Sequence, residues 1–194
     1  MIITHEQLEQ MLPDASDATV MKFFMPLNET LERFNIVTKL RIACFIAQVG
    51  HESGSFRYMQ ELASGQAYNN RKDLGNLETD AVNIAKANHT TVGQWFKGHG
   101  PIQITGFYNH KRLSEFFGED FLNHPELLCT PHWGMLSAGW FWDIHKLNNF
   151  ADLGKFLTIT KRINGGTNGL DDRVRRFKNC LAVYNVPFQQ SFLS

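Results

Sequence analysis

The chain has only three cysteines among its 194 residues, and they lie far apart at Cys44, Cys129 and Cys180. They form no C-x-x-C pair and no cysteine–histidine spacing typical of a zinc site. The sequence therefore predicts neither a disulfide framework nor a structural metal, and we expect buried or free thiols in a protein made in a reducing compartment.

Charge of one sign and long apolar runs are also lacking. Lys and Arg together number 19, as do Asp and Glu, so the formal net charge is +0, which disfavours a nucleic-acid-binding function. The first residues, MIITHEQLEQMLPDA, contain no basic segment followed by an apolar one, so no signal peptide is predicted. No apolar run approaches the roughly 20 residues of a membrane span. A target outside the cytoplasm would thus need a separate delivery route.

Several catalytic motifs are missing as well. His51-Glu52 begins like the zinc-protease motif H-E-x-x-H, but the second histidine is absent. The chain also has no G-x-S-x-G, no Walker A motif and no G-x-G-x-x-G. Serine hydrolase chemistry, phosphate binding and metal catalysis therefore have no basis in the sequence, and we expect no cofactor.

What the sequence does contain is helical periodicity on both sides of an irregular middle. The apolar pattern predicts a predominantly α-helical α+β fold. A helix starting near Asn35 or Thr38 and running to Gly50 is apolar on most of its circumference, which is typical of a buried helix. Residues 54–100 are rich in glycine, asparagine and serine, which predicts loops and short helices, with a small hairpin around 96–105. Further helices are predicted at 17–33, 107–118, 131–146, 151–162 and 171–184.

Two glutamates lie on the boundary between the buried helix and the loops. Glu52 ends the helix in GHESGSF, and Glu61 follows in RYMQELASGQAY. Two carboxyl groups across one glycosidic bond are what glycoside hydrolysis needs, one of them kept protonated by apolar surroundings. On spacing alone the signal is weak, and a solvated pair is the default interpretation.

Two further stretches add groups suited to a sugar. GHGPIQITGFYN has an alternating pattern that predicts Gln103 and Thr105 on one face of a short strand, with Asn109 behind them. RINGG places Asn164 in a glycine-flanked turn, where an amide can approach a ligand closely.

Taken in order, HESGSF, QELASGQAY, GHGPIQITGFYN and RINGGTNGLDDR resemble the motifs of glycoside hydrolase family 19, the chitinase-like enzymes, and most of all its short bacteriophage endolysins. LRIACFIAQVGHESGSF and NHPELLCTPHWGMLSAGWFW extend the resemblance over about residues 36–184. It implies a lysozyme-like bilobed fold with a substrate cleft between the lobes. It also implies a single catalytic domain over 1–194, without a separate wall-binding domain. The helical lobe would cover about 1–52 and 106–194, and the loop-rich lobe about 53–105.

The resemblance also implies roles for individual residues in an inverting mechanism without metal. Glu52 matches the general acid, Glu61 the general base, and Thr105 a residue that holds the attacking water. Glu78 is an alternative base within the loop region. The expected sugar contacts are Gln103, Tyr108, Asn109, Asn164, Trp95 and His99, with His51 and Arg173 as supporting residues.

Some features depart from the family pattern or have a simpler explanation. His99 stands where many relatives have arginine, so the way a carboxylate is held could differ. The aromatic run with Trp133, Trp140, Phe141 and Trp142 fits a helix core better than a sugar platform, whereas Trp95 and Tyr108 flank the candidate cleft. The basic face of 171–178 is more typical of a solvated helix than of a site for anionic wall polymers.

The sequence thus predicts an endolysin of the lysozyme type that cleaves the β-1,4 bonds of peptidoglycan strands. We expect a monomeric, antimicrobial protein, made in the bacterial host cytoplasm and acting on the wall in the periplasm after release by a separate pore protein. A chitinase acting on chitin oligomers, an antibacterial effector and an inactive wall-binding module remain as alternatives.

Overall fold

The computed structural model describes residues 1–194, and the chain divides into two compact units. Unit 1 comprises Met1–Arg57 and Ala138–Ser194, and unit 2 comprises Tyr58–Ser137. Unit 2 is larger than the 53–105 lobe expected from the sequence, because helix α6 and the segment that follows it group with the loop-rich region. As predicted, the chain is predominantly helical, and its only β-type pairing is two isolated bridges.

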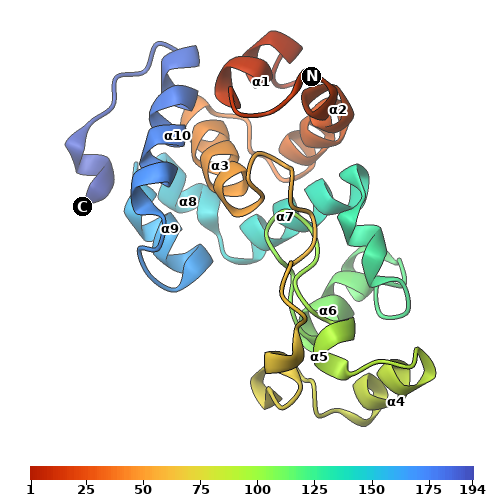
Figure 1. Cartoon of the computed structure of the whole chain (residues 1–194). Coiled ribbons are helices and arrows are strands. Elements are labelled where there is room, and N and C mark those ends of the chain that lie inside the picture. Colours follow the sequence, from red (N-terminus) through yellow and green to blue (C-terminus); the bar gives the residue numbers. More distant parts are fainter. The chain divides into compact units, whose positions relative to one another are not determined.

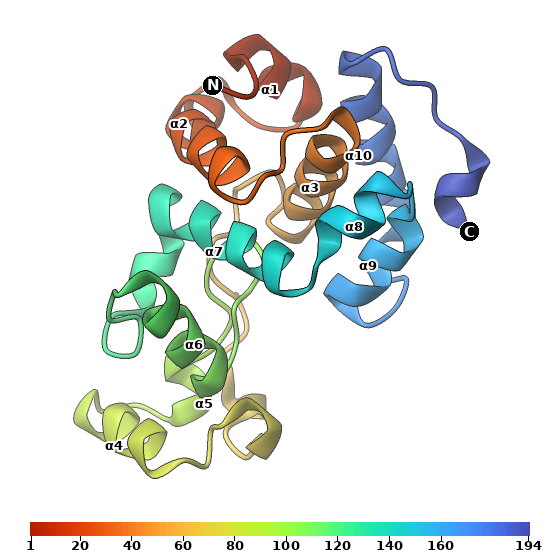
Figure 2. The same cartoon turned by 180° about the vertical axis from the view of Figure 1, so that it is seen from behind.

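Unit 1 is built around the buried helix α3, which lies beside α10, α8 and α9 (Figure 1) and is seen from behind in Figure 2. Its elements are α1 (His5–Met11), α2 (Asp17–Arg33), α3 (Lys39–Glu52), α8 (Leu147–Asp152), α9 (Phe156–Asn164), α10 (Leu170–Val183) and the short η4 (Gln190–Leu193), with the C-terminal part of α7 (Pro131–Ile144). Thr38 caps α3 by accepting a hydrogen bond from the backbone N–H of Arg41. Every α3 residue from Ile42 to Gly50 is buried, so the prediction of a buried helix is confirmed.

The predicted helix over 151–162 is wrong. The chain instead ends α8 at Asp152 and starts α9 at Phe156. Gly154 adopts a left-handed backbone with φ of 66°, which breaks the helical hydrogen bonding. The Asp152 carboxylate accepts two hydrogen bonds from Arg41, at 2.7 and 2.5 Å, which fixes the end of α8 against the start of α3.

The aromatic part of α7 that belongs to unit 1 contributes to its core. Trp140 and Trp142 are buried, and Trp142 packs edge-on against Phe45 of α3 with a centroid distance of 5.3 Å. This confirms that these two tryptophans form core rather than a sugar platform. Trp133, in the part of α7 within unit 2, is half-buried against Phe117 and Phe121.

Unit 2 consists of short helices and turns around a small apolar cluster. Its elements are η1 (Gln66–Tyr68), η2 (Lys72–Leu74), α4 (Thr79–Ala87), α5 (Val92–Trp95), α6 (Phe107–Phe117) and η3 (Pro125–Cys129). Ala81, Phe96 and Phe107 form the cluster, and Trp95 and Tyr108 pack against it. No helix of the chain combines the length and apolar character needed to cross a membrane.

Candidate active site

Glu52 is the last residue of α3, and its side chain remains 21% exposed although the helix before it is buried. The helix ends there because Gly54, Ser55 and Phe56 all have positive φ values of 57°, 61° and 67°. Two contacts hold this unusual turn: Arg176 donates to Ser55 Oγ at 2.8 Å, and buried Phe56 packs on Phe23. The chain thus presents a partly exposed carboxylate at the end of a rigid element.

Arg173 of α10 holds that carboxylate from the interior. Its side chain is 2% exposed, and its guanidinium donates to Glu52 Oε1, to Gln48 Oε1 at 2.6 Å and to the Asn168 carbonyl at 3.1 Å. Gln48 in turn donates through Nε2 to Thr160 Oγ1 at 2.6 Å. A buried guanidinium with several acceptors has little freedom to move, so Glu52 is held in a fixed orientation through one oxygen. Sequence reasoning missed Gln48 and Thr160.

His51 and Asp172 form a hydrogen-bonded pair beside Glu52. Its Nδ1 lies 2.7 Å from Asp172 Oδ2. Burial opposes the ionisation of Asp172, but hydrogen bonds from Arg176, His51 and Arg175 outweigh it and hold the pKa of this carboxyl well below its usual range. Asp172 is therefore an anion that orients the imidazole. Nothing in the sequence spacing indicates this pair, since 121 residues separate its members.

Asn164 closes the turn between α9 and α10. Its side chain donates to the Asn168 carbonyl at 2.9 Å and accepts from the backbone N–H of Gly166 at 2.7 Å. The same Asn168 carbonyl accepts from Arg173. Asn164 was predicted as a sugar contact. In this structure its side chain stabilises the turn whose Asn168 carbonyl accepts from the Arg173 guanidinium.

Glu61, in unit 2, is fixed by two hydrogen bonds to its carboxylate. Tyr68 Oη donates to Oε1 at 3.0 Å, and the backbone N–H of Gly98 donates to Oε2, also at 3.0 Å. The Glu61 backbone N–H donates back to the Gly98 carbonyl at 2.8 Å. Burial, followed by the hydrogen bond to Glu61 and its negative charge, raises the pKa of Tyr68. Tyr68 was not predicted, although it closes the QELASGQAY motif that contains Glu61.

Gln103, Thr105 and Asn109 do come together, but not through the strand predicted for them. Gln103 has a φ of 57° in a turn, and its side chain donates to the Gly100 carbonyl at 2.8 Å. Thr105 Oγ1 donates to the Gln103 carbonyl at 2.9 Å, and Asn109 donates to the Thr105 carbonyl at 2.8 Å. A turn replaces the strand because His99 pairs with Ile104 across it, so only that bridge remains of the predicted hairpin.

Gly98 joins this turn to Glu61. A Cβ atom on Gly98 would lie 2.5 Å from Gln103 Oε1, and the Gly98 backbone is the hydrogen-bonding partner of Glu61. The glycine is therefore required by the close approach of the Gln103 carboxamide. Unit 2 thus gathers Glu61, Gln103 and Thr105, three of the predicted site residues, around one short segment.

Tyr108, Glu78 and Trp95 lie elsewhere in unit 2. Tyr108 Oη donates to Glu78 Oε1 at 2.5 Å, and this hydrogen bond is the main cause of the raised pKa of Tyr108. Trp95 donates through its indole N–H to the Leu122 carbonyl at 2.8 Å. Both aromatic rings are half-buried, and Glu78 is an exposed residue at the start of α4.

His99 is 2% exposed, so the structure places it in the interior of unit 2 rather than where a sugar contact would lie. His110 Nδ1 lies 2.9 Å from the Gly106 carbonyl and must carry the proton, because a carbonyl only accepts. Neutral His110 then accepts through Nε2 from His99 Nδ1 at 3.2 Å. Burial lowers the pKa of His99 to about 3, aided by electrostatic interaction with His110, and burial lowers that of His110 to about 4.

Because burial lowers the pKa of both histidines, we expect acid to destabilise unit 2. Unfolding exposes imidazoles with a pKa of about 6.5, so the unfolded state binds more protons once the pH falls below that value. Stability should be complete above about pH 6.5 and decline towards pH 4, by about 2 to 3 kcal/mol per histidine at pH 4.5. Urea unfolding at pH 7 and pH 4.5 measures this loss. His99→Gln should reduce the dependence of the free energy of unfolding on pH, whereas His89→Gln, at an exposed position, should leave it unchanged. An equal loss of stability between pH 7 and pH 4.5 in the wild type and both variants would contradict the prediction.

Comparisons with known proteins show which proteins the chain is similar to. A family model described as chitinase class I matches residues 2–152. A glycosyl hydrolase family 19 domain-containing protein of Haemophilus influenzae is 24% identical over 205 residues, covering 95% of this chain and 98% of that protein. An endochitinase of Arabidopsis thaliana is 34% identical over 131 residues, which cover 67% of this chain and 41% of the plant protein. The chain thus matches less than half the length of that endochitinase.

Solved structures share the fold. Chitinase C from Streptomyces griseus has a TM-score of 0.75 at 20% identity, covering 100% of this chain and 80% of that one. A class IV chitinase from Zea mays has a TM-score of 0.71 at 20% identity, with 98% and 96% covered.

Proposed function

The chain belongs to the chitinase class I family, glycoside hydrolase family 19, and from this premise we propose that it is a lysozyme-type endolysin. As a glycoside hydrolase it takes a glycan polymer as its substrate class. The finer proposal is that it cleaves the β-1,4 bonds between the N-acetylmuramic acid and N-acetylglucosamine units of peptidoglycan. The resemblance of its ordered motifs to short phage enzymes supports this choice.

The observation that carries the proposed mechanism is the partly exposed Glu52 held by the buried Arg173. The guanidinium occupies Oε1, while Oε2 makes no hydrogen bond and can carry the proton that the leaving oxygen needs. We therefore assign Glu52 as the general acid. Arg173 acts through Glu52 and is a positioning residue.

Glu61 suits the general base better than Glu78 does. Its two oxygens are oriented by Tyr68 and Gly98, whereas Glu78 is exposed at a helix start. Thr105 and Gln103 lie on the segment next to Glu61 and supply a hydroxyl and a carboxamide for the attacking water and the sugar. An inverting reaction requires the two carboxyl groups to stand roughly 6.5–9.5 Å apart around the bound sugar.

A digest of two substrates tests the proposed specificity. The protein is incubated with purified peptidoglycan and, separately, with chitin oligomers, and the products are identified by mass spectrometry. New reducing ends on muramic acid are expected. Cleavage of chitin alone would overturn the peptidoglycan proposal in favour of a chitinase, which the names of the plant relatives favour. No cleavage of either substrate would favour the inactive wall-binding module.

Delivery follows from the proposed target. We propose that a monomer is made in the host cytoplasm and reaches the wall through a separate pore protein. An antibacterial effector role would need the same chemistry with a different delivery route. The endolysin and effector roles are distinguished by expressing the protein inside bacteria and comparing lysis with and without a co-expressed pore protein.

A further inference from the structure

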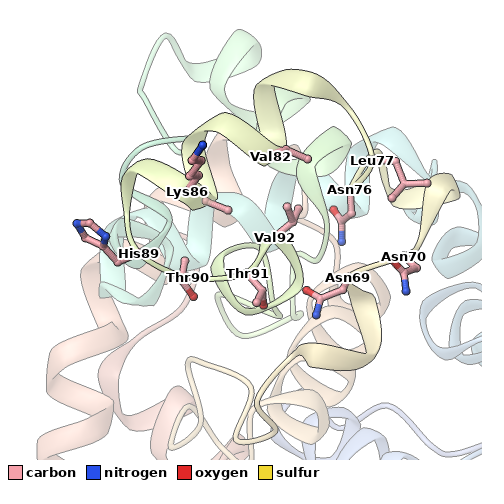
Figure 3. Close-up of a pocket in the computed structure, with 11 residues that line it drawn as sticks. Asn69, Asn70, Asn76, Leu77, Val82, Lys86, His89, Thr90, Thr91 and Val92 are labelled. Carbon is pink, nitrogen blue, oxygen red and sulfur yellow. The ribbon is translucent and has the colours of Figure 1, made fainter.

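Unit 2 contains a surface pocket of about 470 Å³ that none of the assigned catalytic groups lines. Three segments form it: the end of η1, helix α4 with its preceding turn, and the start of α5 (Figure 3). In Figure 3, Lys86 and His89 stand on one side and the asparagines on the other. The lining residues are Asn69, Asn70, Asn76, Leu77, Val82, Ala85, Lys86, His89, Thr90, Thr91 and Val92. Its volume is within the range of small-ligand sites.

The asparagine side is rigidly built. Asn76 is fully buried and bridges two segments, donating to the Tyr68 carbonyl at 2.8 Å and accepting from the Phe107 N–H at 3.0 Å. Asn69 accepts through Oδ1 from the Gly93 N–H at 2.8 Å, which leaves its Nδ2 donor without a hydrogen bond in the structure. A Cβ atom on Gly93 would lie 2.4 Å from the Gly65 carbonyl, so α5 packs closely on this wall. These contacts fix the asparagine wall of the pocket.

The pocket has one lysine, Lys86, and no acidic residue. Lys86 and His89 are exposed and form no ion pair, and no aspartate or glutamate is among the lining residues. This contrasts with the zero net charge of the whole chain and with the ion-paired arginines of α10. An unpaired lysine on one side of the pocket and an available amide donor on the other favour a ligand with an anionic group such as a carboxylate.

Apolar side chains complete the pocket. Leu77 and Val82 are 54% and 44% exposed, and Ala85 and Val92 lie beside them. Exposed aliphatic groups next to a cation suit a ligand with small alkyl groups close to a carboxylate. A bare chitin chain has no carboxylate, whereas the peptide arms of peptidoglycan carry both methyl groups and free carboxylates.

We propose that this pocket binds the peptide arm of peptidoglycan, with Lys86 on a peptide carboxylate, Asn69 on a peptide carbonyl and Leu77 and Val82 against alanyl methyl groups. This inference rests on the proposed function, because it explains how a chitinase-like chain would favour a peptide-bearing glycan. It adds a binding site and leaves the hydrolytic step to Glu52 and Glu61.

Kinetics on two forms of the same glycan test the proposal. Peptidoglycan strands are compared before and after an amidase removes their peptides, using the wild type, Lys86→Gln and the matched control Lys111→Gln, an exposed lysine of α6. Lys86→Gln should raise KM on intact strands about tenfold, because it removes one charge-assisted contact. The value of kcat should not change, and on strands without peptides the variant should behave like the wild type. Equal KM values for the two variants on intact strands would overturn it.

A binding measurement separates this inference from the proposed function. Amide chemical shifts of the wild type and of Lys86→Gln are followed by NMR during titration with N-acetyl-L-alanyl-D-glutamate and, separately, with chitotriose. The dipeptide should shift residues 69–92 of the wild type and bind Lys86→Gln about tenfold more weakly. If the protein cleaves peptidoglycan but the dipeptide leaves residues 69–92 unmoved, the pocket proposal fails alone. If the dipeptide binds there but peptidoglycan is not cleaved, the proposed function fails alone.

Discussion

Replacing Glu52 by glutamine is expected to lower glycan hydrolysis by about 100-fold or more, because the amide cannot donate a proton to the leaving oxygen. The variant keeps the shape of the side chain, and its carbonyl oxygen can still accept from Arg173, so α3 and α10 should remain joined. The release of soluble wall fragments from peptidoglycan, followed over time, measures the effect.

The control for this variant is Glu115→Gln, which removes an exposed carboxylate of α6 and should leave the rate unchanged. Circular dichroism and thermal unfolding establish that both variants fold. A Glu52→Gln protein that is folded and retains more than a few per cent of the wild-type rate would remove Glu52 from the role of general acid. The loss should appear in kcat, since proton donation occurs in the chemical step.

The position of Glu52 was predictable from local sequence. An apolar pattern around most of the circumference identifies a buried helix, and Thr38 and the GSF turn define its two ends. A carboxylate placed at such a boundary is neither core nor free surface, which made Glu52 the natural candidate. Local information is sufficient here because helix burial and helix ends depend on residues a few positions apart.

The family resemblance implied Arg173 and His51 as supporting residues, but sequence spacing alone could not show which groups they contact. Arg173 and Asp172 reach residues 121 positions earlier, and no spacing rule connects α3 with α10 over that distance. His99 was expected as a sugar contact from the family resemblance, but its side chain is buried. Its burial depends on the pairing with His110 and Ile104, which only the folded chain reveals. Alternation at 101–105 similarly favoured a strand, but a positive φ at Gln103 turns the chain.

Replacing Gln48 by glutamate is expected to move the alkaline limb of the pH–rate profile upward by about one pH unit. Gln48 lies one helical turn before Glu52 and shares Arg173 with it, so a carboxylate at position 48 would compete for the same guanidinium. The added negative charge favours the protonated form of the neighbouring general acid, and activity should then persist to higher pH. Measuring kcat/KM between pH 4 and pH 9 for the wild type and the variant gives the shift.

Thr160→Val is the matched control, because it removes the acceptor of the Gln48 amide without adding charge. It should cost about 1 to 3 kcal/mol of stability, since a buried donor loses its partner, while the alkaline limb stays in place. A purely structural role for Gln48 would lower the stability of both variants and move neither profile, which would refute the electrostatic link. A shift confined to Gln48→Glu would instead show that Arg173 divides its charge between two side chains of α3, and that the neutral amide at position 48 keeps most of that charge on Glu52.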